Sequence, residues 1–217
     1  MNDDQTIEYY QKRAQEYEKI YFRDVPPRQA ELKRLYDLSR RVMAGRQVLD
    51  LACGTGFWTE FISEEANLIV GVDINSGTLA EAQKKKYRNQ AEFVLTDFNQ
   101  LPFARNSFDA LLATFILSHV RRQDIGGLKD HLRTTIKPGS PVFLCDNNVI
   151  TEIVPDLSWD GDHINSYVNR KLENGEQYRI LKNYYDRQEL IDVMASWGKL
   201  ETVIFETYYW GIVLNLD

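Results

Sequence analysis

A carboxylate followed closely by two glycines is the feature of this sequence that best predicts chemistry. An apolar run over residues 48–51 contains Asp50, and it ends in the small-residue turn 52–56, which holds Gly54 and Gly56. The segment from 57 to 66 is compatible with a helix. Strand, glycine turn and helix in this order let the backbone approach a nucleotide-like ligand without a clashing Cβ.

A second carboxylate lies where such a ligand would need it. The apolar run 68–72 ends in Asp73. An acidic side chain at the tip of the second strand of this unit is placed to accept hydrogen bonds from both ribose hydroxyls. Turn and acid together are a much stronger signal than either alone, and they predict a ligand that contains ribose.

The residues around the turn favour one cofactor over another. A dinucleotide site requires a third glycine three residues after the second, where this chain has Thr59, and the bulky Phe57 and Trp58 stand where a pyrophosphate would lie. Asp50 would repel a pyrophosphate but suits a cationic amino group. S-adenosyl-L-methionine carries an amino group and a sulfonium and no phosphate, so we favour it over NAD. A purely structural turn is the remaining alternative.

The stretch 49–56, Leu-Asp-Leu-Ala-Cys-Gly-Thr-Gly, resembles the class I S-adenosylmethionine-dependent methyltransferases, and the resemblance covers nearly the whole chain. Ala52 replaces the first glycine of many members with another small residue. The resemblance implies S-adenosyl-L-methionine as cofactor and S-adenosyl-L-homocysteine as product. It also implies that Asp97 binds the adenine amino group and that Phe98 packs near the ring. The predicted cofactor-binding residues in this core are Asp50, Ala52, Gly54, Gly56, Trp58, Asp73, Ile74, Asp97, Phe98 and Phe115.

The N-terminal segment predicts a cover for this site. Residues 5–20 have helical character, with Tyr10, Arg13, Ala14 and Tyr17 on one face. The pattern resembles the N-terminal lid of small-molecule methyltransferases, which implies that Tyr10 or Arg13 binds the carboxylate of the cofactor. The alternative is that these four side chains only pack in the core.

The acceptor side is predicted from the segment that follows the fourth strand. Residues 114–120 come after the strand 108–113 and include His119. Ligands of an open α/β sheet gather outside the carboxyl ends of the strands, so this segment should border the reacting methyl group. His119 is therefore the candidate catalytic residue, as a base or an anion binder, with a purely structural histidine as the alternative.

Two basic residues further along complete the predicted acceptor site. Spacing alone leaves open whether Arg170 and Lys182 share a pocket or are solvated. Five stretches, 9–17, 54–59, 117–120, 170–182 and 189–197, resemble in order and interval the phosphonate O-methyltransferases of the dehydrophos type. That resemblance implies that His119, Arg170 and Lys182 surround an anionic oxygen acceptor. Tyr21 is included as a further contact, although residues 21–25 match poorly.

The chemistry agrees with such an acceptor. The oxygen of a phosphonate, phosphate or carboxylate is already an anion, so it needs its charge held by Arg and Lys more than it needs a base. Methylation of oxygen or nitrogen in another small metabolite is the alternative. A third hypothesis is a non-catalytic protein that binds S-adenosylmethionine.

The elements that must position these residues predict one α/β domain of 217 residues. We expect a Rossmann-like, seven-stranded, mostly parallel sheet with a C-terminal antiparallel hairpin. Its predicted parts are a helical lid (1–45), a cofactor-binding core (46–145), a substrate-pocket insertion (146–185), and a C-terminal helix and strands (186–217). Within the insertion, 165–172 is predicted as a short helix and 177–185 as a strand.

Composition limits the partners. A net charge of −6 and a pI near 5.2 argue against a nucleic-acid substrate, because no basic excess is available to neutralise phosphates. No run has the length of a membrane span, and the first residues lack the pattern of a signal peptide. Cys53 and Cys145 are predicted to be buried thiols in a reducing cytoplasm, and no metal-ligand spacing occurs. We therefore expect a cytoplasmic monomer or homodimer that acts on a small molecule.

Overall fold

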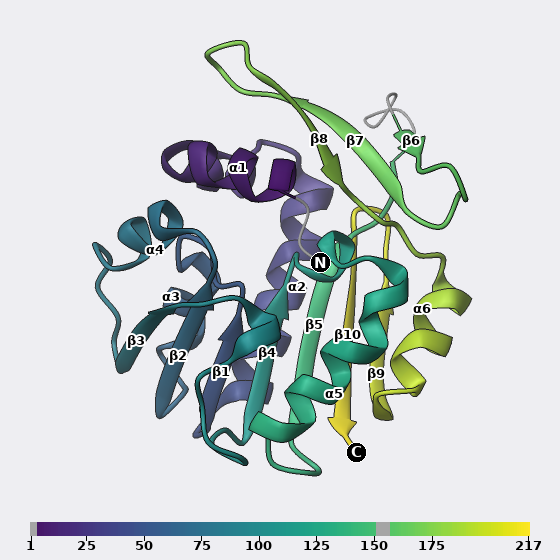
Figure 1. Ribbon diagram of the computed structural model, residues 1–217. Coiled ribbons are helices and arrows are strands. Elements are labelled where there is room, and N and C mark those ends of the chain that lie inside the picture. Colours follow the sequence, from purple (N-terminus) through teal and green to yellow (C-terminus); the bar gives the residue numbers. More distant parts are fainter. Residues whose placement is uncertain (1–3, 151–156) are drawn as a thin grey trace.

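The main sheet of the computed structural model contains seven strands (Figure 1). The structure describes residues 4–150 and 157–217, so residues 1–3 of the predicted lid and 151–156 of the predicted insertion lie outside the described residues. The strands are β1 (Gln47–Leu51), β2 (Leu68–Asp73), β3 (Gln90–Leu95), β4 (Ala110–Thr114), β5 (Pro141–Asn147), β9 (Gly198–Phe205) and β10 (Tyr209–Leu216). Their order across the sheet is β3-β2-β1-β4-β5-β10-β9.

The pairing of these strands confirms the predicted fold class. Strands β1 to β5 pair in parallel, and β10 is antiparallel to both β5 and β9. All five residues of β4 are buried, as expected for a parallel strand covered on both faces. The strand order reverses between β1 and β4. The crevice outside the carboxyl ends at this point is where a sheet of this kind binds its ligand.

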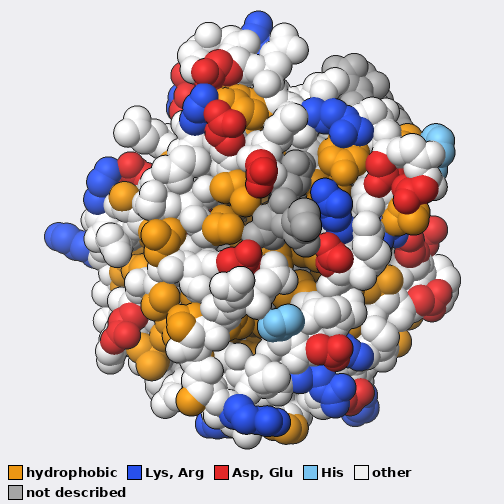
Figure 2. Space-filling model, in the orientation of Figure 1, with side chains coloured by type: hydrophobic (Ala, Val, Ile, Leu, Met, Phe, Trp, Pro, Cys, Tyr) orange, Lys and Arg blue, Asp and Glu red, His pale blue; other side chains and the backbone are white. Residues whose placement is uncertain are grey.

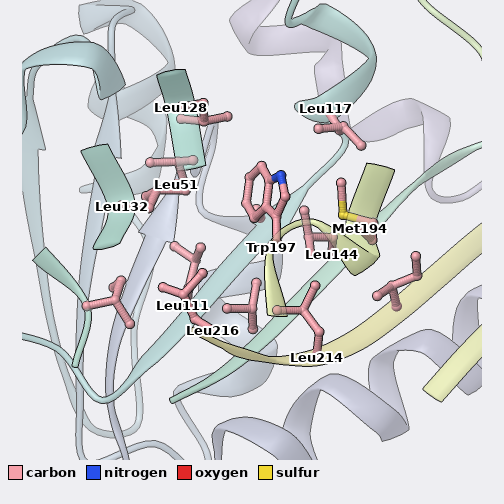
Figure 3. Packing of buried hydrophobic residues seen from close by; sticks show 14 of the residues in the cluster. Leu51, Leu111, Leu117, Leu128, Leu132, Leu144, Met194, Trp197, Leu214 and Leu216 are labelled. Atoms are coloured by element: carbon pink, nitrogen blue, oxygen red, sulfur yellow. The ribbon is translucent and has the colours of Figure 1, made fainter. Parts of the chain in front are cut away.

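Helices cover both faces of the sheet and form two hydrophobic clusters. On one face, α2 (Pro26–Met43) and α3 (Phe57–Ile62) pack against strand residues whose side chains point to that face, such as Val48 and Leu112. On the other, α5 (Ile125–Thr135) and α6 (Arg187–Ala195) pack against Leu111 and Leu144. Figure 3 shows Trp197 between Leu51, Leu144 and Met194 in this second cluster. A sheet packed on both faces is a rigid support for a site at its edge.

The N-terminal segment lies across the carboxyl end of the sheet (Figure 1). The helix predicted over 5–20 forms α1 (Asp4–Arg13) and then tightens into the 3₁₀ helix η1 (Ala14–Ile20). The helix α4 (Ser76–Ala82) contacts both. Three further 3₁₀ turns occur, η2 (Phe98–Gln100), η3 (Leu117–His119) and η4 (Arg122–Asp124). Both segments of the N-terminal cover therefore rest on α4, which follows β2.

A separate three-stranded sheet follows β5. It contains β6 (Leu157–Trp159), β7 (Ser166–Lys171) and β8 (Gln177–Leu181), with β7 antiparallel to both neighbours. The short helix predicted at 165–172 is wrong, because these residues pair with β8 through the turn that contains Gly175, whose φ is +94°. Figure 1 shows β7 and β8 passing over α1. A backbone N–H of β8, that of Leu181, donates to Thr6 Oγ1 at 2.9 Å, which joins the cover to the inserted sheet.

No helix among residues 4–150 and 157–217 has both the length and the apolar character that crossing a bilayer requires. Figure 2 shows acidic and basic side chains interspersed over the face that it presents, as on ordinary solvated faces.

Candidate active site

Two adjoining cavities open at the carboxyl end of the main sheet. The first is lined by Ala52, Gly54, Asp73, Ile74 and Phe98, and the second by Arg13, Arg23, Arg28, Arg170 and Lys182. Tyr10, Tyr17, Phe115 and His119 contact both cavities. These four shared side chains form the wall between an acidic compartment and a basic one. Most of the predicted site residues are therefore brought to one place.

Asp73 organises the first cavity. Its Oδ2 accepts a hydrogen bond from the backbone N–H of Gly54 at 2.8 Å, and its Oδ1 accepts one from the backbone N–H of Asn75, also at 2.8 Å. Burial raises the pKa of this carboxyl group, and the two backbone hydrogen bonds oppose that rise. A carboxylate has about four lone-pair sites. Asp73 also lines the first cavity, so its carboxylate is accessible to the hydroxyl groups of a ligand there.

Asp50 lies behind the first cavity with one oxygen unused. Its Oδ2 accepts from Thr59 Oγ1 at 2.6 Å, and its Oδ1 has no hydrogen-bond partner in the described part of the chain. Burial raises the pKa of Asp50 to about 7. The hydrogen bond from Thr59 opposes this rise, and the charge of Asp73 adds to it. Because buried acceptors are normally satisfied, this oxygen fits a cationic donor that residues 4–150 and 157–217 do not supply.

Besides Asp50, four predicted residues line neither cavity. Trp58 is buried in the core against Tyr36 and Phe115, and Tyr21 stacks on Phe57 with ring centroids 4.0 Å apart. Asp97 accepts from the backbone N–H of Asn99 at 2.8 Å and begins η2. The fourth is Gly56, which packs against α4 and is considered next. The structure thus gives Trp58 and Tyr21 packing contacts, while Phe98, next to Asp97, does reach the first cavity.

The two glycines of the turn have different physical roles. Both have left-handed backbones, with φ of +57° at Gly54 and +72° at Gly56. A Cβ on Gly54 would meet nothing within 4 Å, whereas one on Gly56 would overlap the hydroxyl of Tyr87. That hydroxyl donates to the carbonyl of Ala82 at 2.8 Å. Gly54 therefore leaves room for a ligand, and Gly56 lets α3 approach α4.

Alanine substitutions should separate these roles. We expect Gly54→Ala to lower the free energy of unfolding by about 1–2 kcal/mol, the usual cost of a left-handed Cβ. Gly56→Ala should cost about 1 kcal/mol more, because it also displaces the Tyr87 hydroxyl. Urea unfolding measures both. Gly54→Ala should weaken donor binding more than Gly56→Ala does, and equal losses of stability would contradict the packing role of Gly56.

A buried ion pair supports the second cavity. The Nζ of Lys182 donates to Asp146 Oδ1 at 3.0 Å and to Ser118 Oγ at 2.7 Å, and Asp146 Oδ2 accepts from the backbone N–H of Ser118 at 3.0 Å. Burial opposes ionisation of Asp146, but the neighbouring Lys182 charge holds its pKa below the usual value. Burial lowers the pKa of Lys182, and Asp146 offsets part of that effect. Asp146 therefore fixes the Lys182 ammonium at the cavity.

Asp146 was not predicted as a site residue, since the insertion was expected to begin there. It instead belongs to β5, which extends to Asn147. A signal was available, because Asp146 ends an apolar strand run just as Asp73 does. Arg23 and Arg28 were also missed. They lie on either side of the proline pair at 26–27.

His119 is held as a neutral imidazole with a defined tautomer. Its Nδ1 lies 2.6 Å from the carbonyl oxygen of Leu181, and its Nε2 lies 2.9 Å from the hydroxyl of Tyr10. Because a carbonyl only accepts, Nδ1 carries the proton and Nε2 accepts from Tyr10. Burial, followed by the charge of Lys182, lowers the pKa of His119 to about 3. His119 thus positions Tyr10 and is not a cation near neutral pH.

This protonation state predicts a pH dependence. The folded pKa of His119 is below its ordinary value of 6.5, so its contribution to stability is present above pH 6.5 and is lost as the pH falls toward 3. We expect the imidazole resonances of His119 to stay constant between about pH 5 and 8 in an NMR titration. The His119→Gln variant assigns the signal. A midpoint near the ordinary value would contradict the buried, neutral state.

Comparison with known proteins agrees with this architecture. Residues 48–139 match the family described as Methyltransferase domain. Over 102 residues the chain is 35% identical to a demethylmenaquinone methyltransferase of Beutenbergia cavernae, an alignment that covers 47% of this chain and 41% of that protein. The chain spans less than half the length of the curated relatives that it matches first.

Two solved structures resemble the chain over nearly its whole length. They are described as DhpI complexes, one with SAH and one with SAM and HEP, and both are 24% identical to this chain. Their TM-scores are 0.78 and 0.77, and the matches cover 99% and 98% of this chain and 96% and 99% of theirs. With the family match, this likeness confirms the predicted fold and the predicted resemblance.

Proposed function

We propose that this chain, whose residues 48–139 match the Methyltransferase domain family, transfers a methyl group from S-adenosyl-L-methionine to an oxygen of a small anionic molecule. The acceptor class is a phosphonate, phosphate or carboxylate. The observation that carries the proposal is the pair of cavities. An acidic one suits an adenosyl cofactor, a basic one suits an anion, and Tyr10, Tyr17, Phe115 and His119 lie between them.

The first cavity supplies the groups that the cofactor needs. Asp73 would accept from the ribose hydroxyls, and the unpaired Oδ1 of Asp50 would balance the amino group. From the adjoining second cavity, Arg13, whose guanidinium carbon lies 5.6 Å from the ring centroid of Tyr17, would bind the carboxylate. Bound there, S-adenosyl-L-methionine supplies a methyl group that its sulfonium activates toward in-line displacement. A structure of similar fold was solved with SAM, which supports this use of the site.

The second cavity orients the acceptor. Arg170 and Lys182 would hold its charge, and an oxygen that is already anionic needs little help from a base. Neutral His119 and the Tyr10 hydroxyl border both cavities and would keep this oxygen facing the methyl group. Placing the reactants is the main catalytic contribution that such an arrangement makes.

Transfer to an uncharged oxygen or nitrogen acceptor is the alternative. The relatives include demethylmenaquinone methyltransferases, but the basic lining of the second cavity favours an anion. Buried, free Cys53 and Cys145 suit a reducing cytoplasm, where we propose that the protein acts. An assay with labelled donor and a panel of phosphonates, carboxylates, phenols and amines tests the acceptor class. Turnover confined to phenols or amines would overturn it.

The Arg170→Gln variant tests the acceptor site. We expect the acceptor KM to rise about tenfold, since one charge-assisted hydrogen-bonding group is lost, while cofactor affinity is nearly unchanged. Arg179→Gln is the matched control. It removes the same charge from the neighbouring strand β8, where the Arg179 guanidinium lies 3.6 Å from the ring centroid of Tyr167 and outside the cavity lining. Equal effects of both variants would contradict the role of Arg170.

A further inference from the structure

We propose that Arg23 and Arg28 form a second anion-binding subsite in the basic cavity, so that the acceptor carries two anionic groups. One group binds Arg170 and Lys182 beside His119, and the other binds Arg23 and Arg28 beside Tyr209. This inference rests on the proposed function, because it names the kind of acceptor that the same site takes.

Arg28 is held in place for such a role. It lies in the first turn of α2, and its Nε donates to the hydroxyl of Tyr209, whose ring centroid is 5.3 Å from the guanidinium carbon. Tyr209 is almost fully buried in the core. Only one of the five N–H donors of Arg28 is used in this contact. The remaining donors belong to a side chain that is already ordered and lines the cavity.

The positive charges of the cavity fall into two groups. Partial burial and then the charges of Arg28 and Arg13 lower the pKa of Arg23, and Arg170 has a smaller effect on it. At the other end, Arg170 lowers the pKa values of both His119 and Lys182. Arg23 is therefore coupled more strongly to Arg28 than to Arg170, and the two groups come from different elements, Arg28 from the first turn of α2 and Arg170 from β7.

The described chain does not neutralise the end that contains Arg23 and Arg28. Lys182 is paired with Asp146, but no carboxylate of residues 4–150 or 157–217 lies within 4.0 Å of the guanidinium groups of Arg23 and Arg28. None of the described residues that line the basic cavity is an Asp or a Glu. Gathering like charges in a partly desolvated space is unfavourable. A ligand with a single anionic group would satisfy one end and leave the other unmatched.

The chemistry of the two ends points to a diacid. The planar fork of a guanidinium binds a carboxylate or a phosphonate through two parallel hydrogen bonds, and two arginines side by side suit either group. The acceptor oxygen would belong to the group beside His119. The second group, held by Arg23 and Arg28, would anchor the far end of the molecule. A short compound with a phosphonate and a carboxylate has the predicted form.

Binding to the protein saturated with S-adenosylhomocysteine tests this subsite without requiring turnover. Calorimetry should show that 3-phosphonopropanoate binds at least about tenfold more tightly than propylphosphonate, which lacks the carboxylate. Arg23→Gln should reduce this preference, and Arg23→Gln with Arg28→Gln should abolish it. Because Arg23 is exposed at the surface, its variant should fold normally, and thermal unfolding verifies this for both variants.

Arg41→Gln is the matched control, because it removes the same charge from α2 about 20 Å further along the helix. Equal binding of the two ligands, or a preference that survives in the double variant, would overturn the inference. A parallel assay with labelled donor separates it from the proposed function. If the protein methylates propylphosphonate and shows no preference for the diacid, the second subsite is contradicted and the proposed reaction is not. A preference that depends on Arg23, without methyl transfer, supports the subsite and contradicts the proposed reaction.

Discussion

Replacing Asp146 with asparagine is expected to lower the free energy of unfolding by about 3–5 kcal/mol. Asp146 is fully buried at the end of β5, and its partner Lys182 is also buried, with Nζ and Oδ1 3.0 Å apart. The variant leaves the Lys182 ammonium without its counter-charge, and breaking a buried pair by removing one partner is more damaging than replacing both. Urea unfolding at neutral pH measures the loss.

A double variant distinguishes the pair from the individual side chains. Asp146→Leu with Lys182→Met removes both charges, so it should recover a large part of the stability that Asp146→Asn loses. The variant should still lose acceptor binding, because the ammonium is gone. A double variant less stable than Asp146→Asn would contradict this account. The pKa of Asp146 is lowered on folding, so its stabilising contribution is present above the ordinary pKa and is lost as the pH falls through the folded value.

Replacing Asp73 with alanine is expected to weaken the binding of S-adenosylhomocysteine about 10–100-fold, or about 1–3 kcal/mol. The carboxylate of Asp73 is predicted to bind both ribose hydroxyls, and it also orders the turn through the backbone N–H groups of Gly54 and Asn75. Both contributions are lost together in the variant. Isothermal titration calorimetry measures the change directly.

Asp109→Ala is a suitable control for Asp73→Ala. Asp109 also accepts a hydrogen bond from a backbone N–H, that of Gln47 at 2.7 Å, but it precedes β4 and lies at the opposite end of the sheet from the cavities. We expect this variant to lose some stability and to keep its affinity for the cofactor. Unchanged affinity in Asp73→Ala would contradict its predicted contact with ribose.

The residues of the first cavity could be brought together from the sequence because their signals are local in the chain. The turn 52–56 and Asp73 each follow an apolar strand directly, and parallel strands bring their carboxyl ends to one edge. The seven-stranded sheet, its C-terminal hairpin and the N-terminal cover could be predicted for the same reason. Tyr10 and His119 also reach the cavities, although the hydrogen bond between them joins residues 109 positions apart.

The rest of the site depends on contacts between distant segments. Asp146 and Lys182 are 36 positions apart, and the pairing of Arg28 with Tyr209 spans 181. No periodicity in the sequence reports such contacts. Trp58 and Tyr21 were predicted to contact ligands because they lie near the glycine turn or the cover. Aromatic side chains are equally suited to the hydrophobic core, and both are packed there. The helix predicted at 165–172 was wrong because pairing with β8 decides its structure.

Titrating the protein with S-adenosylhomocysteine, and in parallel with NAD, tests the central claim most directly. The claim is that the cavity lined by Asp73 and Gly54 receives an adenosyl amino acid and no dinucleotide. We predict saturable binding of one S-adenosylhomocysteine per chain and no heat of binding for NAD. A folded protein that binds NAD, or that binds neither compound, would contradict the account.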